Sequence, residues 1–189
     1  MTTKHIFDLD NTLVYTNEAN NDAYNMALIQ LGMKPIEGVE RITREIVFKK
    51  YSNLTDLQRC RIVEKKQELF PLEKTRTNKD LLWFVRQIGR DNCFVWSGAD
   101  PMRGRAILRY HEMETLFADV QFSKKENITQ ELFELSRCLG ISLQDITIYE
   151  DIDEYIMELR NIGITVIDAK TWRPADVIGQ EAVFLPDSL

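Results

Sequence analysis

The chain has 189 residues, of which 44% are hydrophobic and 29% charged, and it carries a net charge of −6. This length and composition exclude intrinsic disorder and allow one core domain with a small addition. The negative charge is opposite to the basic surface that binding of a nucleic-acid polymer requires, so we expect no such partner.

The cysteines and the apolar segments indicate the cellular setting. The three cysteines, Cys60, Cys93 and Cys138, are odd in number and widely spaced, which is typical of a reduced protein without a disulfide framework. The N-terminus lacks an apolar run of signal-peptide length, and no segment is long enough to span a membrane. We therefore expect a cytoplasmic protein, a monomer or homodimer, with no membrane partner.

The first half of the chain predicts one strand followed by helices. Residues 4–8 form a short apolar run that ends in an acid, which predicts a buried strand. Helical spacing of apolar residues predicts a helix over 18–31, two or three helices between 38 and 70, and another helix over 78–88.

The second half alternates strands and helices. We predict strands at 93–96, 117–122, 146–149 and 164–167, and a last short edge strand at 182–185. Helices are expected at 101–111, 128–139 and 155–161. This alternation predicts an α/β fold with a doubly wound parallel sheet.

The connection between the first two strands is unusually long. It contains about 80 residues, whereas a parallel crossover needs a single helix. We therefore predict that residues 15–72 form a small all-helical cap over the sheet. Residues 1–14 and 73–189 would form the α/β core.

Polar side chains follow the predicted strands where each strand ends. In chain order these are Asp8, Asp10, Thr12, Ser97, Lys124, Lys125, Glu150 and Asp151. The carboxyl ends of parallel strands meet at one edge of the sheet, where ligands bind. Carboxylates gathered there repel one another unless a cation such as Mg²⁺ lies among them. A hydroxyl group and an ammonium group beside them indicate a site for a phosphoryl group.

Four sequence motifs, each at a strand end, resemble those of the haloacid dehalogenase-like hydrolase superfamily. They are FDLDNTL at 7–13, VWS at 95–97, SKKEN at 123–127 and IYEDID at 148–153. The resemblance covers almost the whole chain, and the helical cap falls where this family places its small cap.

The resemblance implies a phosphatase that works through a covalent intermediate. Asp8 would attack phosphorus and form an aspartyl-phosphate. Asp10 would protonate the leaving oxygen and then activate water, while Thr12 would orient Asp10 and hold the turn. An acid at position 10 argues against the dehalogenase branch, in which halide leaves without a proton.

The same resemblance implies the remaining site residues. Ser97 and Lys125 would bind the phosphoryl oxygens, and Mg²⁺ would lie between Asp8, the backbone carbonyl of Asp10 and Asp151. The substrate would be a small phosphorylated metabolite, such as a nucleoside monophosphate or a sugar phosphate.

Several alternatives stay open at this stage. Lys124 could take the place of Lys125, Glu150 could be a ligand or a structural group, and Asp153 could be the second acid of the fourth motif. A phosphomutase would have the same motifs, and a non-catalytic binding protein could use the same fold. A signalling receiver domain is disfavoured, because it has an adjacent acidic pair on its first strand and no cap.

Overall fold

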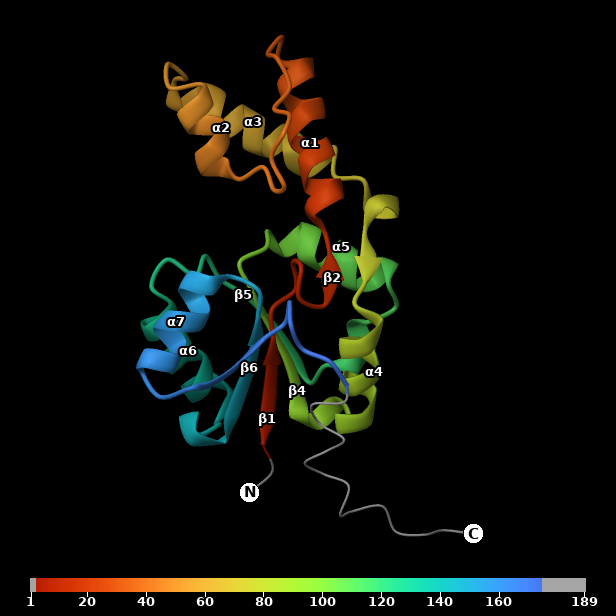
Figure 1. Cartoon of the computed structure of the whole chain (residues 1–189), viewed down its shortest axis with the longest axis vertical. Coiled ribbons are helices and arrows are strands. Elements are labelled where there is room, and N and C mark those ends of the chain that lie inside the picture. The colour runs from red at the N-terminus through yellow and green to blue at the C-terminus, as the bar shows by residue number, and fades with distance from the viewer. Residues whose placement is uncertain (1–2, 175–189) are drawn as a thin grey trace.

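The computed structural model describes residues 3–174 and contains a central parallel sheet with helices on both faces (Figure 1). The sheet has five strands in the order β5-β4-β1-β6-β7, and every neighbouring pair is parallel. Its strands are β1 (Lys4–Phe7), β4 (Cys93–Ser97), β5 (Asp119–Phe122), β6 (Ile146–Glu150) and β7 (Thr165–Asp168). This order confirms the doubly wound α/β sheet: from β1 the chain first adds strands on one side, β4 and β5, and then on the other, β6 and β7.

Two helical layers cover the sheet. Helices α4 (Lys79–Ile88) and α5 (Pro101–Tyr110) pack on one face, and α6 (Ile128–Leu139) and α7 (Asp153–Asn161) pack on the other. Successive residues of a strand point to opposite faces. In β1, Ile6 accordingly packs in the cluster that contains α6 and α7, and Phe7 packs in the cluster that contains α4 and α5.

Short polar caps determine where the helices begin after the strands. The Asp100 carboxylate accepts hydrogen bonds from the amides of Met102 and Arg103, and Pro101 opens α5. Asn127 caps α6 in the same way, and Gly140 ends it in a left-handed conformation. Single 3-10 turns complete the connections: η1 (Leu72–Lys74), η2 (Arg90–Asn92), η3 (Glu114–Leu116) and η4 (Leu143–Asp145).

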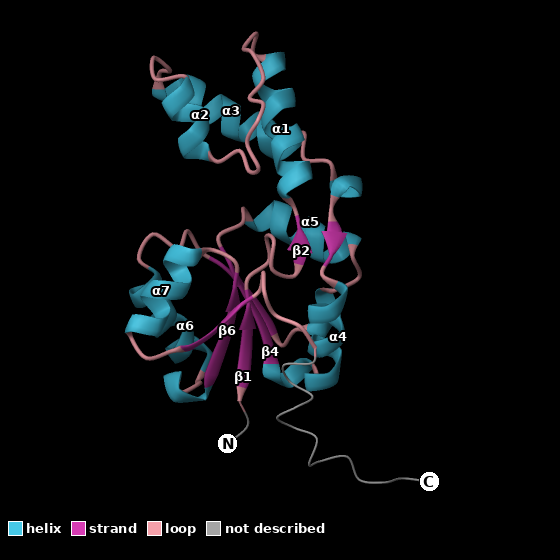
Figure 2. Cartoon of the chain, viewed as in Figure 1, coloured by secondary structure: helices cyan, strands magenta, loops and turns pink. Residues whose placement is uncertain are grey.

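The long connection after β1 forms a separate helical module at the carboxyl end of the sheet (Figure 2). It contains α1 (Asn17–Gln30), α2 (Arg44–Lys50) and α3 (Asp56–Glu68), so the segment 38–70 has two helices. These helices enclose an apolar cluster of their own, formed by Tyr24, Leu28, Ile36, Ile42, Val47 and Ile62. The module is thus packed around its own core.

A two-stranded antiparallel ribbon joins this module to the core. Strands β2 (Val14–Tyr15) and β3 (Arg76–Thr77) pair Val14 with Thr77 and Tyr15 with Arg76. Strands of two residues have no alternation that a sequence pattern could reveal, which is why the ribbon was not predicted. The predicted strand at 182–185 lies outside the described residues.

Candidate active site

The chain turns sharply directly after β1. The amide of Asp8 still bonds to the Tyr149 carbonyl of β6 at 2.9 Å, but the Val14 amide turns back to the Leu9 carbonyl at 3.0 Å. Asn11 has a φ of 61°, a left-handed conformation that asparagine tolerates better than most residues. This loop buries both Asp8 and Asp10.

Lys125 lies between two of the carboxylates at this edge of the sheet. Its ammonium group is buried and donates hydrogen bonds to Asp8 Oδ1 at 2.8 Å and to Glu150 Oε2 at 2.7 Å. Burial alone would lower the pKa of Lys125, but the two carboxylates raise it well above its usual range. Lys124 is exposed and lies 3.7 Å from Glu126, so the geometry favours Lys125 over the alternative Lys124.

Three carboxylates meet beside this lysine. One oxygen each of Asp8, Glu150 and Asp151 lie within 4.8 Å of one another. The pKa of Asp8 is raised to about 7, chiefly by burial and also by repulsion from Glu150 and Asp10, although the attraction of Lys125 opposes this rise. Burial likewise raises the pKa of Asp151 to about 8, helped by the charges of Asp8 and Glu150. Such a group is unfavourable without further positive charge.

The donor set fits a hard divalent cation. Asp151 Oδ1 is buried and has no hydrogen-bond partner among the described residues, so this oxygen is free to bind a metal ion. Glu150 is different, because Oε2 binds Lys125 while Oε1 accepts the amides of Asp151 at 2.9 Å and Ile152 at 3.1 Å. Glu150 therefore positions its neighbours. The backbone carbonyl of Asp10 stays a predicted ligand.

Asp10 has a partner that was not predicted from the sequence. Arg103 donates from Nη1 to Oδ1 at 2.8 Å and from Nη2 to Oδ2 at 2.6 Å, and Thr16 Oγ1 donates to Oδ1 at 2.8 Å. Burial would raise the pKa of Asp10, but Arg103 and Thr16 hold it well below its usual range. The only sequence signal for Arg103 is a cation in the first turn of a helix, where the helix dipole disfavours it.

Thr12 lies in the loop after β1, but its hydroxyl does not bond to Asp10 in this structure. Its hydroxyl is buried and has no hydrogen-bond partner within the described part of the chain. Its backbone carbonyl accepts a hydrogen bond from Asn78 Nδ2 at 3.1 Å, which ties the loop to the start of α4. The hydroxyl that orients Asp10 belongs to Thr16, four residues further along, because the loop turns back between them.

Ser97 and Asp153 lie in different environments, one buried and the other at the surface. Ser97 is buried at the end of β4, and the register Phe7–Val95 places it at the same edge of the sheet as Asp8. Its Oγ accepts the Ala99 amide at 3.3 Å. Asp153 pairs with Lys170 on the surface and lies outside the carboxylate group. The geometry thus gives no support to Asp153 as the second acid.

The helical module also contributes to this edge. Arg41, in the loop before α2, places Nη1 3.6 Å from Asp151 Oδ2. Phe70, just after α3, stacks against the guanidinium of Arg103, whose central carbon lies 5.0 Å from the ring centre. Residues of the module and residues of the core therefore share one charged site.

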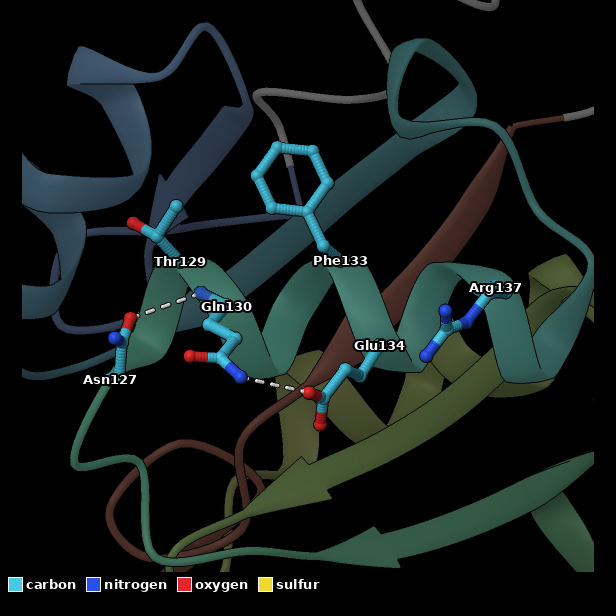
Figure 3. Close-up of a pocket in the computed structure, with 6 residues that line it drawn as sticks. All are labelled: Asn127, Thr129, Gln130, Phe133, Glu134 and Arg137. Carbon is cyan, nitrogen blue, oxygen red and sulfur yellow. Dashed lines mark hydrogen bonds between the residues drawn. The ribbon is translucent and has the colours of Figure 1, made fainter.

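A surface hollow on the protein is lined by none of the residues of this site. It lies on the outer face of α6 and is lined by Asn127, Thr129, Gln130, Phe133, Glu134 and Arg137 (Figure 3). Asn127 caps the helix through the Gln130 amide, and the Gln130 side chain bonds to Glu134 at 3.0 Å. These polar groups serve the helix itself.

The fold is shared with solved structures of a haloacid dehalogenase-like hydrolase and of predicted phosphatases. A haloacid dehalogenase-like family hydrolase from Streptococcus pneumoniae superimposes with a TM-score of 0.69 at 14% identity, covering 88% of this chain and 84% of the other. A predicted phosphoglycolate phosphatase from Haemophilus somnus gives 0.70 at 16% identity, with the same coverage. A predicted phosphatase from Clostridium acetobutylicum gives 0.68 at 14% identity, covering 97% of this chain and 99% of the other.

These similarities were found by comparing structures, and comparisons of the sequence found none. No protein-family model matches the sequence, and no curated protein is similar to it. At such low identity the comparisons establish the fold. Within residues 3–174, no helix has both the length and the apolar content that crossing a membrane requires.

Proposed function

We propose that this protein is a Mg²⁺-dependent phosphatase that hydrolyses a small phosphorylated metabolite through an aspartyl-phosphate on Asp8. The observation that supports this most strongly is the position of Asp8 at the end of β1, bonded to Lys125 and adjacent to Asp151. A nucleophile, a cation for the phosphoryl oxygens and a metal ligand thus occupy one buried cluster. The neighbours of the same fold include hydrolases and phosphatases.

In the first step an oxygen of Asp8 attacks phosphorus, and the bond from phosphorus to the leaving oxygen breaks. Asp8 must be ionised to attack, and the charge of Lys125 favours that form. Lys125 and the hydroxyl of Ser97 would bind the phosphoryl oxygens as negative charge shifts onto them. A Mg²⁺ ion held by Asp8, the Asp10 backbone carbonyl and Asp151 would offset the repulsion between phosphate and carboxylates.

Asp10 would act as the acid and then as the base. In the first step it must give a proton to the leaving oxygen, whereas Arg103 holds it in the ionised form. The first step therefore requires that Arg103 release Asp10 at least in part, for example to bind an anionic group of the substrate, and that Asp10 take up a proton from solvent before it donates one. Ionised Asp10 is suited to the second step, in which it takes a proton from the water that attacks the aspartyl-phosphate.

The helical module would act as a cap that controls access to this site. Its joint to the core is the short ribbon of β2 and β3, directly after the loop that carries Asp8 and Asp10. Arg41 of the module reaches Asp151, so closure brings positive charge to the carboxylates. A cap of this kind excludes water during attack and selects the leaving group.

Phosphate release from a metabolite panel tests the proposal. Purified protein is incubated with Mg²⁺ and small phosphomonoesters, including sugar phosphates, nucleoside monophosphates and p-nitrophenyl phosphate, and free phosphate is measured. We expect turnover that the Asp8→Asn variant lacks. Absence of phosphate release from every ester by folded wild-type protein, or equal rates for the variant, would contradict the proposed function.

A further inference from the structure

Lys66 is a buried cation whose charge has no anionic partner. It lies on α3, and 5% of its surface is exposed. Its Nζ atom lies 5.3 Å from the centre of the Tyr24 ring and 5.4 Å from that of Phe70. Among residues 3–174 it forms no hydrogen bond and no ion pair. Charged side chains are seldom this buried without a partner, because desolvation of the charge is unfavourable.

The surroundings of Lys66 are predominantly positive. The pKa of Lys66 is lowered to about 7, chiefly by burial and also by the charges of Arg103, Arg41 and Arg44, against the attraction of Asp10. Phe70 connects the two parts of this cluster, since Lys66 and Arg103 both contact its ring. Like charges around a buried ammonium group destabilise the folded protein, so this arrangement is not explained by stability.

The cations of the site divide into two groups. Lys125, Arg103 and Arg41 each lie beside a carboxylate of the core. Lys66 and Arg44 have no ion pair with any described residue. Both unpaired cations belong to the helical module and lie near Tyr24, but Lys66 is buried whereas Arg44 is exposed.

Lys66 lies on the leaving-group side of the site. Asp10 is the acid that would protonate the leaving oxygen, so the leaving group must lie next to Asp10. Phe70 contacts both Lys66 and Arg103, and Arg103 is bound to Asp10, so Lys66 lies toward the Asp10 side of the site. A leaving group bound beside Asp10 and extending toward α3 would therefore approach the ammonium of Lys66 between the Tyr24 and Phe70 rings.

We propose that Lys66, assisted by Arg44, binds a second anionic group on the leaving group, so that the substrate is a phosphomonoester bearing a carboxylate or a second phosphate. This inference rests on the proposed phosphatase function. The second anion would supply the negative charge that the cap cations lack. A phosphomonoester with a neutral leaving group would leave Lys66 buried and unpaired, and its kcat/KM should be lower.

Matched substrate pairs test this assignment. One pair is 3-phosphoglycerate and glycerol 3-phosphate, which differ by a carboxylate; the other is fructose 1,6-bisphosphate and fructose 1-phosphate, which differ by a phosphate. We expect wild-type protein to favour the anionic member of at least one pair by tenfold or more in kcat/KM. The pair that shows the preference identifies the second anion as carboxylate or phosphate.

Variants at two neighbouring lysines separate binding from folding. Lys66→Met keeps the apolar stem and should reduce the preference to less than twofold, whereas Lys66→Arg should keep much of it. Lys65→Met is the matched control, because the Lys65 side chain is 42% exposed and pairs with Glu68 instead of facing the site. This control should leave both members of each pair unchanged.

Two outcomes would overturn the assignment separately from the phosphatase proposal. Wild-type protein could hydrolyse the neutral esters as well as the anionic ones, or Lys66→Met and Lys66→Arg could reduce both members of a pair equally. Either result would mean that Lys66 is a structural residue in an active phosphatase. If wild-type protein released phosphate from no ester, p-nitrophenyl phosphate included, the proposed function would fail and this inference with it.

Discussion

Arg103 binds both carboxylate oxygens of Asp10 in a two-pronged hydrogen-bonded pair, although 93 residues separate them in the chain. Both side chains are almost completely buried, with exposed fractions of 9% and 12%. The pair joins the first helix turn after β4 to the loop after β1. It thereby fixes the acid of the proposed reaction and holds it ionised.

Removal of this arginine should strongly destabilise the protein. Arg103→Met leaves the Asp10 carboxylate buried without its main partner, and we expect a loss of about 3 kcal/mol in the free energy of unfolding. Adding Asp10→Asn should recover much of that loss, because the amide carries no charge. Urea denaturation of the two single variants and the double variant measures the coupling, which should exceed about 1 kcal/mol.

Arg105→Met provides the control for this cycle, since Arg105 is exposed on the same helix. Its effect should stay within about 0.5 kcal/mol. Strict additivity of the Arg103 and Asp10 substitutions would show that the observed pair contributes nothing to stability.

Asp8→Asn should abolish turnover and keep the fold. The amide has nearly the same shape as the carboxylate but is a poor nucleophile, so we expect a kcat below about 1% of wild type. Circular dichroism and the thermal midpoint verify folding. Asp91→Asn, at an exposed position far from the site, should behave like wild type. An Asp8→Asn sample with a substantial rate would exclude the covalent route.

Mg²⁺ should stabilise the folded protein and be needed for turnover. Binding to the folded state alone raises the thermal midpoint as the metal concentration rises. Asp151→Asn should weaken this rise, because the amide lacks the negative charge with which the carboxylate, through its unpartnered Oδ1, would bind the metal ion. Asp153→Asn is the control, since Asp153 pairs with Lys170 at the surface. Identical Mg²⁺ titrations for the two variants, or full activity after chelation, would refute the predicted site.

Lys66→Met should stabilise the protein while it impairs substrate selection. Replacement of an unpaired buried charge by an apolar side chain of similar length should raise the thermal midpoint by about 2 to 4 °C, or roughly 1 kcal/mol. Lys65→Met should leave the midpoint unchanged. A lower midpoint for Lys66→Met would indicate that the contacts with Tyr24 and Phe70 are the reason for this lysine.

His5 should make stability depend on pH. Burial lowers its pKa from 6.5 to about 4, and its Nδ1 lies 3.2 Å from the Tyr149 hydroxyl. As the pH falls from about 6.5 to about 4, the unfolded chain takes up a proton that the folded protein refuses, so the free energy of unfolding decreases. Urea denaturation at several pH values should show a smaller decrease for His5→Gln than for wild type. Parallel profiles would contradict the assignment.

The sequence alone determined the parallel sheet and the edge at which its charged residues meet. Apolar runs of strand length end in Asp8, Ser97 and Glu150, and parallel pairing places those ends together. Helical spacing between the first two strands also predicted the helical module. Such features depend on local periodicity and on chain direction, both of which are present in the linear sequence.

Only the tertiary structure decided the pairings within the site. Arg103 reaches Asp10, and Arg41 reaches Asp151, through contacts between segments about 90 to 110 residues apart, which no local pattern encodes. Thr16 replaces Thr12 as the partner of Asp10 because the loop turns back on itself. The isolation of Lys66 likewise depends on how α3 packs against α1 and Phe70, since burial and charge pairing are properties of the folded chain.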